Sequence, residues 1–254
     1  MTLGFVSLAI FLYLYYNKNG ENMTYVISDI HGMYKKFIAM LEKISFAPED
    51  ELFILGDIVD RGDDPVKILE YIIDKPNIIP LLGNHEVMAL DILKRINVEI
   101  TAKNAETQID EQTISDLMDY QLNGGMPTLN GFKALAPDKR NALIDFMEDF
   151  LPYEAIDIKD KTFVLVHAGL GNFREDKRLS EYTLSELLEM RPDYERQYFS
   201  DNSIYIVSGH TPTQTINGKA EIYQTHNNIV IDCGAAFGGR LACLRLEDMK
   251  EFYV

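Results

Sequence analysis

The chain has 254 residues, of which 46% are hydrophobic, a share typical of a folded globular core. Its 40 acidic and 24 basic side chains leave a formal charge of −16, which argues against bulk nucleic-acid binding because lysine and arginine must displace counterions from phosphates. Two cysteines cannot supply a disulfide framework for a chain of this size, so a reducing, cytoplasmic location is expected.

The first 22 residues form a separate apolar segment. Residues 1–17 carry no charged side chain, and as a helix they would rise about 26 Å, slightly less than the roughly 30 Å hydrocarbon core of a bilayer. No basic residue precedes the apolar run, so cleaved export is not expected. Three interpretations stay open: a weak membrane anchor, a packed or interfacial helix, and an extension without a folding role before Met23.

From Met23 onward, short apolar runs alternate with segments of helical period, which predicts an α/β fold in one catalytic domain over residues 23–254. The predicted strands are Thr24–Ser28, Glu51–Leu55, Asn77–Leu82, Thr162–Val166, Ser203–Val207, Asn228–Ile231 and Arg240–Arg245. The predicted helices are Met33–Ile44, Pro65–Ile73, Glu86–Arg95, Ile114–Gln121, Pro137–Phe150 and Thr183–Glu189. The stretch from about residue 95 to 153 is mostly helical in this interpretation and is expected to form a cap.

Polar clusters directly follow five of the predicted strands: SDIHG, GDIVDRG, GNHE, HAG and GHTP. In open α/β sheets ligands bind beyond the carboxyl ends of the strands, so we expect these clusters to meet in one crevice. Four of the five histidines in the chain lie inside the clusters: His31, His85, His167 and His210.

The side chains of these clusters suit a pair of divalent transition metals. They offer two carboxylates, one amide oxygen and three imidazoles, from Asp29, His31, Asp57, Asn84, His167 and His210. Imidazole suits Mn, Fe, Zn and Ni, and a carboxylate between two ions can bridge them. Two ions about 3.5–4 Å apart can hold a hydroxide and clamp a phosphoryl group for in-line attack.

As an ordered set, the motifs resemble those of the metal-dependent phosphoprotein phosphatases in the calcineurin-like metallophosphoesterase superfamily. The resemblance is closest to small bacterial and phage-type serine/threonine protein phosphatases. It rests on Asp29-x-His31, Gly56-Asp57-x-x-Asp60-Arg61-Gly62, Gly83-Asn84-His85-Glu86, His167-Ala168-Gly169, Gly209-His210, Ile231-Asp232-x-Gly234 and Phe237-Gly238-Gly239. It implies two mixed β-sheets in a sandwich, flanked by helices.

The resemblance also implies a role for each matched residue. Asp29 and His31 would bind the first metal, Asp57 would bridge, and the second metal would be held by Asn84, His167 and His210. His85 would be the general acid that protonates the leaving oxygen, oriented by Asp60. The ions are expected to be Mn²⁺, with Fe, Zn or Ni as alternatives.

Two arginines are expected to hold the phosphate oxygens. The resemblance implies Arg61 and a second arginine between the HAG and GH motifs, for which we choose Arg191. Three other arginines lie in the same interval: Arg174, Arg178 and Arg196.

The implied activity is hydrolysis of phosphomonoesters by a metal-bound hydroxide, at phosphoserine or phosphothreonine of proteins and also at phosphotyrosine. The first alternative is a symmetrical dinucleoside tetraphosphate hydrolase, because Asn123-Gly124-Gly125 with Thr128 resembles a Gly-Gly-x-x-Thr element shared by both kinds of enzyme. A plain turn between helices would explain the same residues. A third hypothesis is a membrane-tethered phosphate sensor without turnover, although a pure binder has no use for His85 as an acid.

A cysteine-nucleophile phosphatase is not expected. The run from Cys233 to Arg240 has six intervening residues where such loops have five, and Asp232 precedes the cysteine. A neighbouring carboxylate disfavours the thiolate that this chemistry needs.

Overall fold

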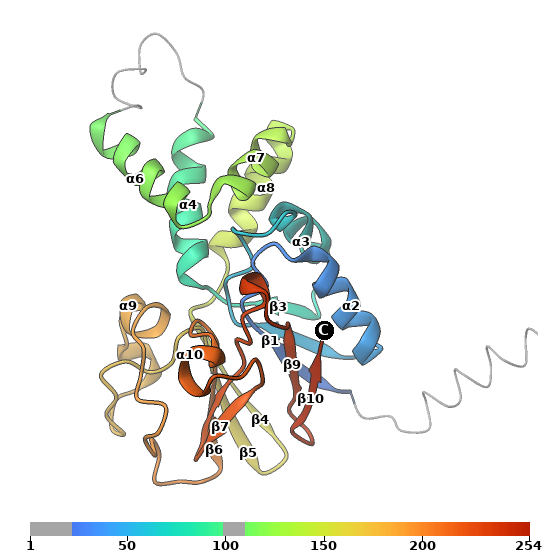
Figure 1. Ribbon diagram of the computed structural model, residues 1–254, viewed down its shortest axis with the longest axis vertical. Helices are drawn as coiled ribbons and strands as arrows, with labels where there is room; N and C mark the ends of the chain where they lie inside the picture. The colour runs from blue at the N-terminus through green and yellow to red at the C-terminus, as the bar shows by residue number, and fades with distance from the viewer. Residues whose placement is uncertain (1–21, 99–109) are drawn as a thin grey trace, which may run out of the picture.

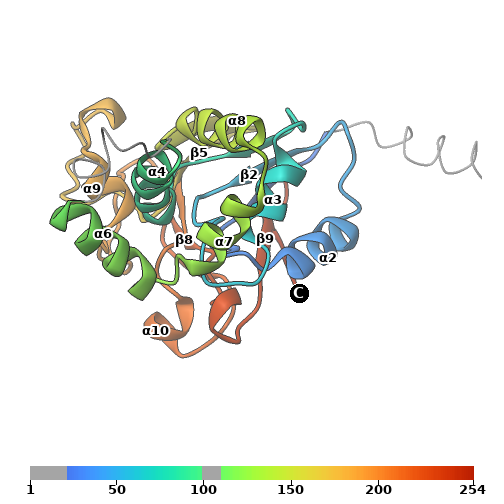
Figure 2. The same ribbon diagram turned by 90° about the horizontal axis from the view of Figure 1, so that it is seen from above.

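The computed structural model describes residues 22–98 and 110–254, which form two face-to-face β-sheets with helices on both outer faces (Figure 1, Figure 2). One sheet has the strand order β10-β9-β1-β2-β3 and the other has the order β4-β5-β6-β8-β7. Strands β1, β2 and β3 are parallel, as are β5, β6 and β8, and the outer strands β4, β7, β9 and β10 pair antiparallel. The expected sandwich of two mixed sheets is therefore confirmed.

The strands are short. The first sheet contains β1 (Thr24–Ile27), β2 (Glu51–Ile54), β3 (Ile78–Pro80), β9 (Ala242–Arg245) and β10 (Lys250–Tyr253). The second contains β4 (Tyr153–Ile158), β5 (Lys161–Val166), β6 (Ile204–Ser208), β7 (Tyr223–Thr225) and β8 (Asn228–Val230).

Alternating side chains along the central strands build three apolar layers. Val26 of β1 and Phe163 of β5 lie in the core between the two sheets. Ile27 points to the opposite face of its sheet, where α2 (Tyr34–Ile44) and α3 (Pro65–Ile72) cover it. Val164 does the same in the second sheet, under α9 (Leu184–Leu188). Because both faces are covered, the strands read as continuous apolar runs, which is why the sequence pattern detected them.

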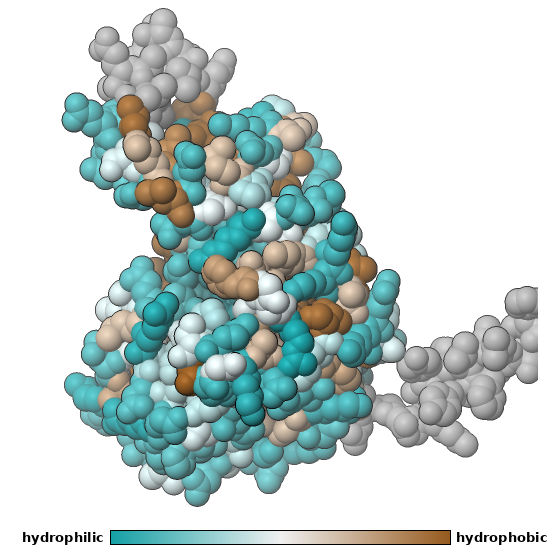
Figure 3. All heavy atoms as spheres, viewed as in Figure 1, coloured by the Kyte–Doolittle hydropathy of each residue, from teal (hydrophilic) through white to brown (hydrophobic). Residues whose placement is uncertain are grey.

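A helical cap stands over one end of the sandwich (Figure 1). It consists of α4 (Asn84–Ile96), α6 (Glu111–Leu122), α7 (Met126–Ala134) and α8 (Pro137–Glu148), with α4 packed against the other three. Helix α4 begins at Asn84, two residues before the predicted start, so the GNHE cluster opens the helix. Apolar side chains of Ile114, Met118 and Leu122 are exposed on α6, where Figure 3 shows brown atoms.

The sequence pattern missed β4, β7, β10, α7 and the short α10 (Thr213–Asn217). The three missed strands all lie at sheet edges. Edge strands face solvent on one side and carry polar residues, as the half-exposed β4 does, so they lack an apolar run. Helix α7 contains Pro127 and Gly131, which weaken its helical signal.

Within the described ranges, we find no helix both long and apolar enough to cross a membrane. The apolar segment that prompted the anchor hypothesis lies in residues 1–21, outside the described part of the chain.

Candidate active site

Several residues that follow β1, β2 and β6 adopt left-handed backbone conformations without being glycine. They are Asp29, His31, Asp57, Asp60, Arg61 and His210, with φ between 45° and 69°. Such conformations cost about 1–3 kcal/mol each and cluster at functional sites. Backbone hydrogen bonds hold them: the His31 N–H donates to the Asp57 carbonyl at 2.8 Å, and the Arg61 N–H donates to the Gly124 carbonyl at 2.8 Å. Backbone hydrogen bonds therefore connect the two loops to each other and to the cap.

Glu86, in the first turn of α4, anchors the loop that carries Asp57. Its fully buried carboxylate accepts hydrogen bonds from the N–H groups of Asp57 at 2.7 Å, Ile58 at 2.8 Å, Val59 at 3.1 Å and Gly83 at 3.0 Å. Burial, and secondly the charge of Asp57, raise the pKa of Glu86 to about 7. The role of Glu86 is not among those predicted from the sequence, although an acid three residues after a helix N-cap is a recognisable capping signal.

Asp57 lies between two groups of metal-ligating side chains. Its Oδ2 atom is 3.3 Å from His31 Nε2 and 4.0 Å from His85 Nε2. Its Oδ1 atom is 3.4 Å from His167 Nε2, in a group completed by His210. Within each group, the ligand atoms lie within 4.8 Å of one another. A carboxylate whose two oxygens face two ligand groups has the geometry of a bridging ligand.

The imidazoles present lone pairs to these groups. His31 Nδ1 donates to the Val59 carbonyl at 2.9 Å, and His167 Nδ1 donates to the Leu55 carbonyl at 2.7 Å. Each Nε2 is therefore left as an acceptor that faces Asp57, and such backbone partners commonly fix metal-binding histidines. Burial lowers the pKa of His31. Burial, and secondly the charge interaction with His167, lower the pKa of His210 to about 4. Neutral imidazole is the form that binds a cation.

Asn84 and Asp29 reach the same region from different elements. Asn84 Oδ1 lies 2.9 Å from His167 Nε2 and 3.1 Å from His210 Nδ1, which places the amide in the second group. Asp29 Oδ2 accepts a hydrogen bond from the His210 N–H at 2.9 Å. Burial and the nearby Asp57 raise the pKa of Asp29 well above its usual range. Asp29 belongs to neither three-residue group, so its role as a ligand of the first metal stays a prediction.

His85 is paired with Asp60 and faces Arg61. His85 Nδ1 donates to Asp60 Oδ2 at 2.7 Å, and His85 Nε2 is 2.8 Å from Arg61 Nη2. The other oxygen of Asp60 accepts hydrogen bonds from the hydroxyls of Tyr120 at 2.5 Å and Thr128 at 2.6 Å. Because a guanidinium can only donate, His85 Nε2 accepts a hydrogen bond from Arg61 in this structure. Asp60 holds the ring so that Nε2 is the atom that can exchange a proton.

The cap thus takes part in the site through Tyr120 and Thr128. Thr128 belongs to the Gly-Gly-x-x-Thr element, so that element does more than make a turn: its hydroxyl also accepts the Asp60 N–H at 2.9 Å. Tyr120 was missed, because an aromatic residue in a predicted helix reads as core. Burial and the adjacent Asp60 raise the pKa of Tyr120, so its hydroxyl stays protonated and remains a donor.

We expect Tyr120→Phe to lower kcat for alkyl phosphates about tenfold with KM unchanged, because Asp60 loses one of its donors and orients His85 less well. Aryl phosphates with good leaving groups should be affected less, and steady-state kinetics on both substrates would measure the difference. Tyr205→Phe, on β6 and outside the site pocket, is the matched control and should behave like wild type. Equal losses on both substrates would contradict a positioning role for Tyr120.

A pocket of about 430 Å³ opens over the ligand groups. It is lined by Asp57, Arg61, Asn84, His85, Arg191, His210, Pro212, Gln214, Thr215 and Phe237. Arg191 is the one arginine of the four candidates that lines it. Arg174 pairs with Asp176, Arg178 pairs with Glu181, and Arg196 lies over the rings of Phe173 and Tyr198. The structure thus places Arg61 and Arg191 in one pocket, and their phosphate-binding roles stay predictions.

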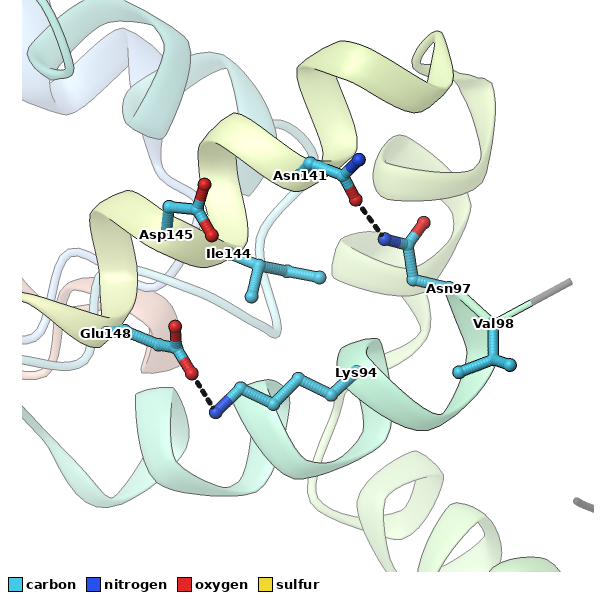
Figure 4. Close-up of a pocket in the computed structure, with 7 residues that line it drawn as sticks. All are labelled: Lys94, Asn97, Val98, Asn141, Ile144, Asp145 and Glu148. Carbon is cyan, nitrogen blue, oxygen red and sulfur yellow. Dashed lines mark hydrogen bonds and ion pairs between the residues drawn. The ribbon is translucent and has the colours of Figure 1, made fainter.

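A second cavity, of about 510 Å³, lies between α4 and α8 in the cap (Figure 4). It contains the Lys94–Glu148 ion pair and a hydrogen bond of 2.6 Å from Asn97 to Asn141. It shares no lining residue with the pocket over the ligand groups, and no histidine or cysteine lines it. We therefore assign the chemistry to the first pocket.

The remaining histidine and the cysteines lie outside this chemistry. His226 is exposed in the turn between β7 and β8. Cys233 and Cys243 are buried and unbridged, and burial raises the pKa of Cys233 to about 12, so its thiol is protonated at neutral pH. This agrees with the expectation that no cysteine serves as a nucleophile.

Residues 24–241 match the family model of the calcineurin-like phosphoesterases. The chain belongs to this family. The asymmetrical bis(5′-nucleosyl)-tetraphosphatase PrpE of Bacillus thuringiensis (strain Al Hakam) is 26% identical to it, over 90% of this chain and 92% of the relative. A putative diadenosine tetraphosphatase of known structure has a TM-score of 0.63 at 17% identity, covering 93% of this chain and 94% of that one. A serine/threonine phosphatase from Saccharomyces cerevisiae has a TM-score of 0.55 at 14% identity, covering 94% and 80%.

These comparisons support part of the sequence-based expectation. The superfamily is the expected one, and with the two ligand groups it makes the chain a metal-dependent phosphoesterase. The resemblance was expected to be closest to small bacterial and phage-type serine/threonine protein phosphatases, whereas the PrpE relative, which matches 90% of this chain, is named as a dinucleoside tetraphosphatase. The protein phosphatase likeness, at 14% identity, concerns the fold alone.

Proposed function

We propose that this phosphoesterase hydrolyses dinucleoside polyphosphates, with asymmetrical cleavage. The position of Asp57 is the main support for a hydrolytic metal site: its two carboxylate oxygens face different ligand groups below one pocket. The name of the relative that matches 90% of this chain supports the substrate class. The sequence-based hypothesis of phosphoserine or phosphothreonine hydrolysis stays the alternative.

The donor set fits two divalent cations. Buried carboxylates and imidazoles that face the site through Nε2 are suitable ligands, because the Nδ1 atoms of His31 and His167 are already hydrogen-bonded to backbone carbonyls. The first ion would be held by Asp29, His31 and Asp57, and the second by Asp57, Asn84, His167 and His210. Bound ions would supply Lewis-acid activation of water and neutralise charge on the phosphoryl oxygens.

The side chains of this protein would perform the other tasks. Arg61 and Arg191 would hold phosphate oxygens, since both residues line the pocket. His85, fixed through Nδ1 by Asp60, would deliver a proton from Nε2 to the leaving oxygen. Although the whole chain has a formal charge of −16, two bound divalent cations and two arginines would make the site itself attractive to phosphate, because bound ions dominate the field at a site.

We expect the full chain, loaded with Mn²⁺, to hydrolyse diadenosine tetraphosphate with a kcat/KM at least about tenfold above that for phosphoserine peptides or nitrophenyl phosphate. Fe²⁺, Zn²⁺ and Ni²⁺ would be tested in parallel, because the same ligands accept them. Chromatography would identify the products: AMP with ATP for asymmetrical cleavage, ADP alone for symmetrical cleavage.

Each result selects among the hypotheses. ADP alone would replace asymmetrical cleavage with the symmetrical alternative. A preference for phosphopeptides would overturn the dinucleotide proposal and favour a protein phosphatase. Inertness toward all three substrates with every metal would favour the sensor without turnover.

A further inference from the structure

Phe237 is an exposed aromatic residue in the site pocket. Its side chain is 63% exposed, and it is the one aromatic among the large exposed hydrophobic residues in the described part of the chain. It also lines the pocket over the ligand groups. Neither the metal ligands nor the His85 proton path uses it, so its exposure calls for another explanation.

The loop that carries Phe237 is held in place from both ends. Phe237 is the last residue of a short 3₁₀ turn (Ala235–Phe237), and its N–H donates to the Gly234 carbonyl at 2.9 Å. Lys36 Nζ, on α2, donates to the carbonyls of Ala235 at 3.0 Å and Gly239 at 2.6 Å, on either side of the ring. The ring is thus presented on a fixed backbone, which lowers the entropic cost of binding a ligand against it.

The position of Arg61 connects the ring to the phosphate site. The Arg61 Cζ atom lies 4.9 Å from the centroid of the Phe237 ring, and the same guanidinium contacts His31 and His85. Only the guanidinium group of Arg61 would therefore separate a phosphate bound to Arg61 from the exposed Phe237 ring. A ligand that fits both has a phosphate joined by a short linker to a planar ring, as in a nucleoside phosphate.

We propose that Phe237 stacks on a nucleobase of the bound substrate and so determines specificity for nucleotides. This inference rests on the proposed function, because it requires a substrate that carries a nucleoside. Stacking uses the face of the base and reads no hydrogen-bonding edge, so adenine and guanine should be accepted alike. The ring would act on affinity and leave the reacting atoms to the other residues.

The test compares two ligands that differ only in the base. Calorimetry on the Mn²⁺-loaded full chain would give the Kd of AMP and of methyl riboside 5-phosphate, which keeps the sugar and phosphate. We expect AMP to bind about tenfold more tightly to wild type, and this ratio to fall to about one in Phe237→Leu. Phe237→Trp should keep the ratio. If Arg61 moves when the Phe237 ring is lost, the Kd values of both ligands change equally, so their ratio is unaffected.

Met118→Ala, which truncates an exposed apolar side chain on α6 outside the pocket, is the control and should keep the wild-type ratio. A ratio of about one in wild type, or an unchanged ratio in a folded Phe237→Leu, would overturn the stacking role. The readout is binding without turnover. A chain that prefers AMP but leaves diadenosine tetraphosphate intact would overturn the proposed function and keep the stacking role. A chain that hydrolyses diadenosine tetraphosphate but does not prefer AMP would keep the proposed function and overturn the stacking role.

Discussion

Asp57→Asn is expected to lower phosphoester hydrolysis at least about a thousandfold and divalent metal affinity at least about a hundredfold. An asparagine offers one oxygen and an amino group, so it cannot supply an oxygen ligand both beside His31 and beside His167. Steady-state kinetics and elemental analysis of the gel-filtered protein would measure both effects. Asp63→Asn makes the same chemical change at an exposed position of the same loop and should retain activity and metal.

Thermal unfolding separates the ligand role of Asp57 from a structural role. Metal that binds only the folded state stabilises it by about 2.7 kcal/mol when its concentration is a hundred times the Kd. Wild type should therefore melt at a higher temperature with Mn²⁺, and Asp57→Asn should lose this increase. An unchanged increase, or two ions per chain in the variant, would contradict the bridging assignment.

The metal-free variant should melt close to the metal-free wild type, because two electrostatic effects of Asp57 oppose each other. Burial alone would raise the pKa of Asp57, but the neighbouring histidines hold it well below its usual range, so the ionised carboxylate favours the folded state. Burial comes first among the causes that raise the pKa values of Asp29, Glu86 and Asp232, and the charge of Asp57 adds to it. Asparagine at position 57 removes that charge and can still accept the His85 N–H, which is 3.1 Å from Asp57 Oδ1. A clearly lower melting temperature without metal would indicate that Asp57 acts mainly in holding the loop.

The parts of this site that the sequence predicts are those that combine ligand chemistry with a fixed place in the fold. Each of four ligands lies within four residues of the end of a buried strand, so the strand pattern also places them: His31, Asp57, His167 and His210. The structure brings these four together, with Asn84 beside the last two. Asp29 shares the pattern, but its position beside His210 does not by itself make it a ligand.

The residues that the sequence did not predict act through contacts between distant segments. Tyr120 and Asp60 are 60 positions apart, and Lys36 reaches the carbonyl of Gly239 across 203 positions. A helical tyrosine and a helical lysine carry no local signal for such partners, because only the packed fold defines them. Glu86 is intermediate: its capping position is visible in the sequence, but its bonds to the Asp57 loop are not.

His85 has two possible roles in this geometry, as a general acid or as a metal ligand. His85 Nε2 lies close enough to His31 and Asp57 to complete a three-residue ligand group, so it could bind metal instead of moving a proton. Its Nδ1, however, is 2.7 Å from Asp60, whose buried carboxylate accepts the Nδ1 proton and keeps the ring aligned. Metal content therefore distinguishes the two roles directly.

We expect His85→Asn to retain both metal ions and to slow hydrolysis of alkyl phosphates by about 10²- to 10⁴-fold, the usual contribution of a general acid. Nitrophenyl phosphate should lose much less, because nitrophenolate leaves as a stable anion, whereas an alkoxide leaves poorly without a proton. Kinetics on a series of aryl and alkyl phosphates would give the dependence on the leaving group. His226→Asn, at the exposed turn between β7 and β8, is the matched control and should resemble wild type on the whole series. Loss of a metal ion from His85→Asn would show that His85 is a metal ligand. Equal losses of activity for good and poor leaving groups would contradict its assignment as the general acid.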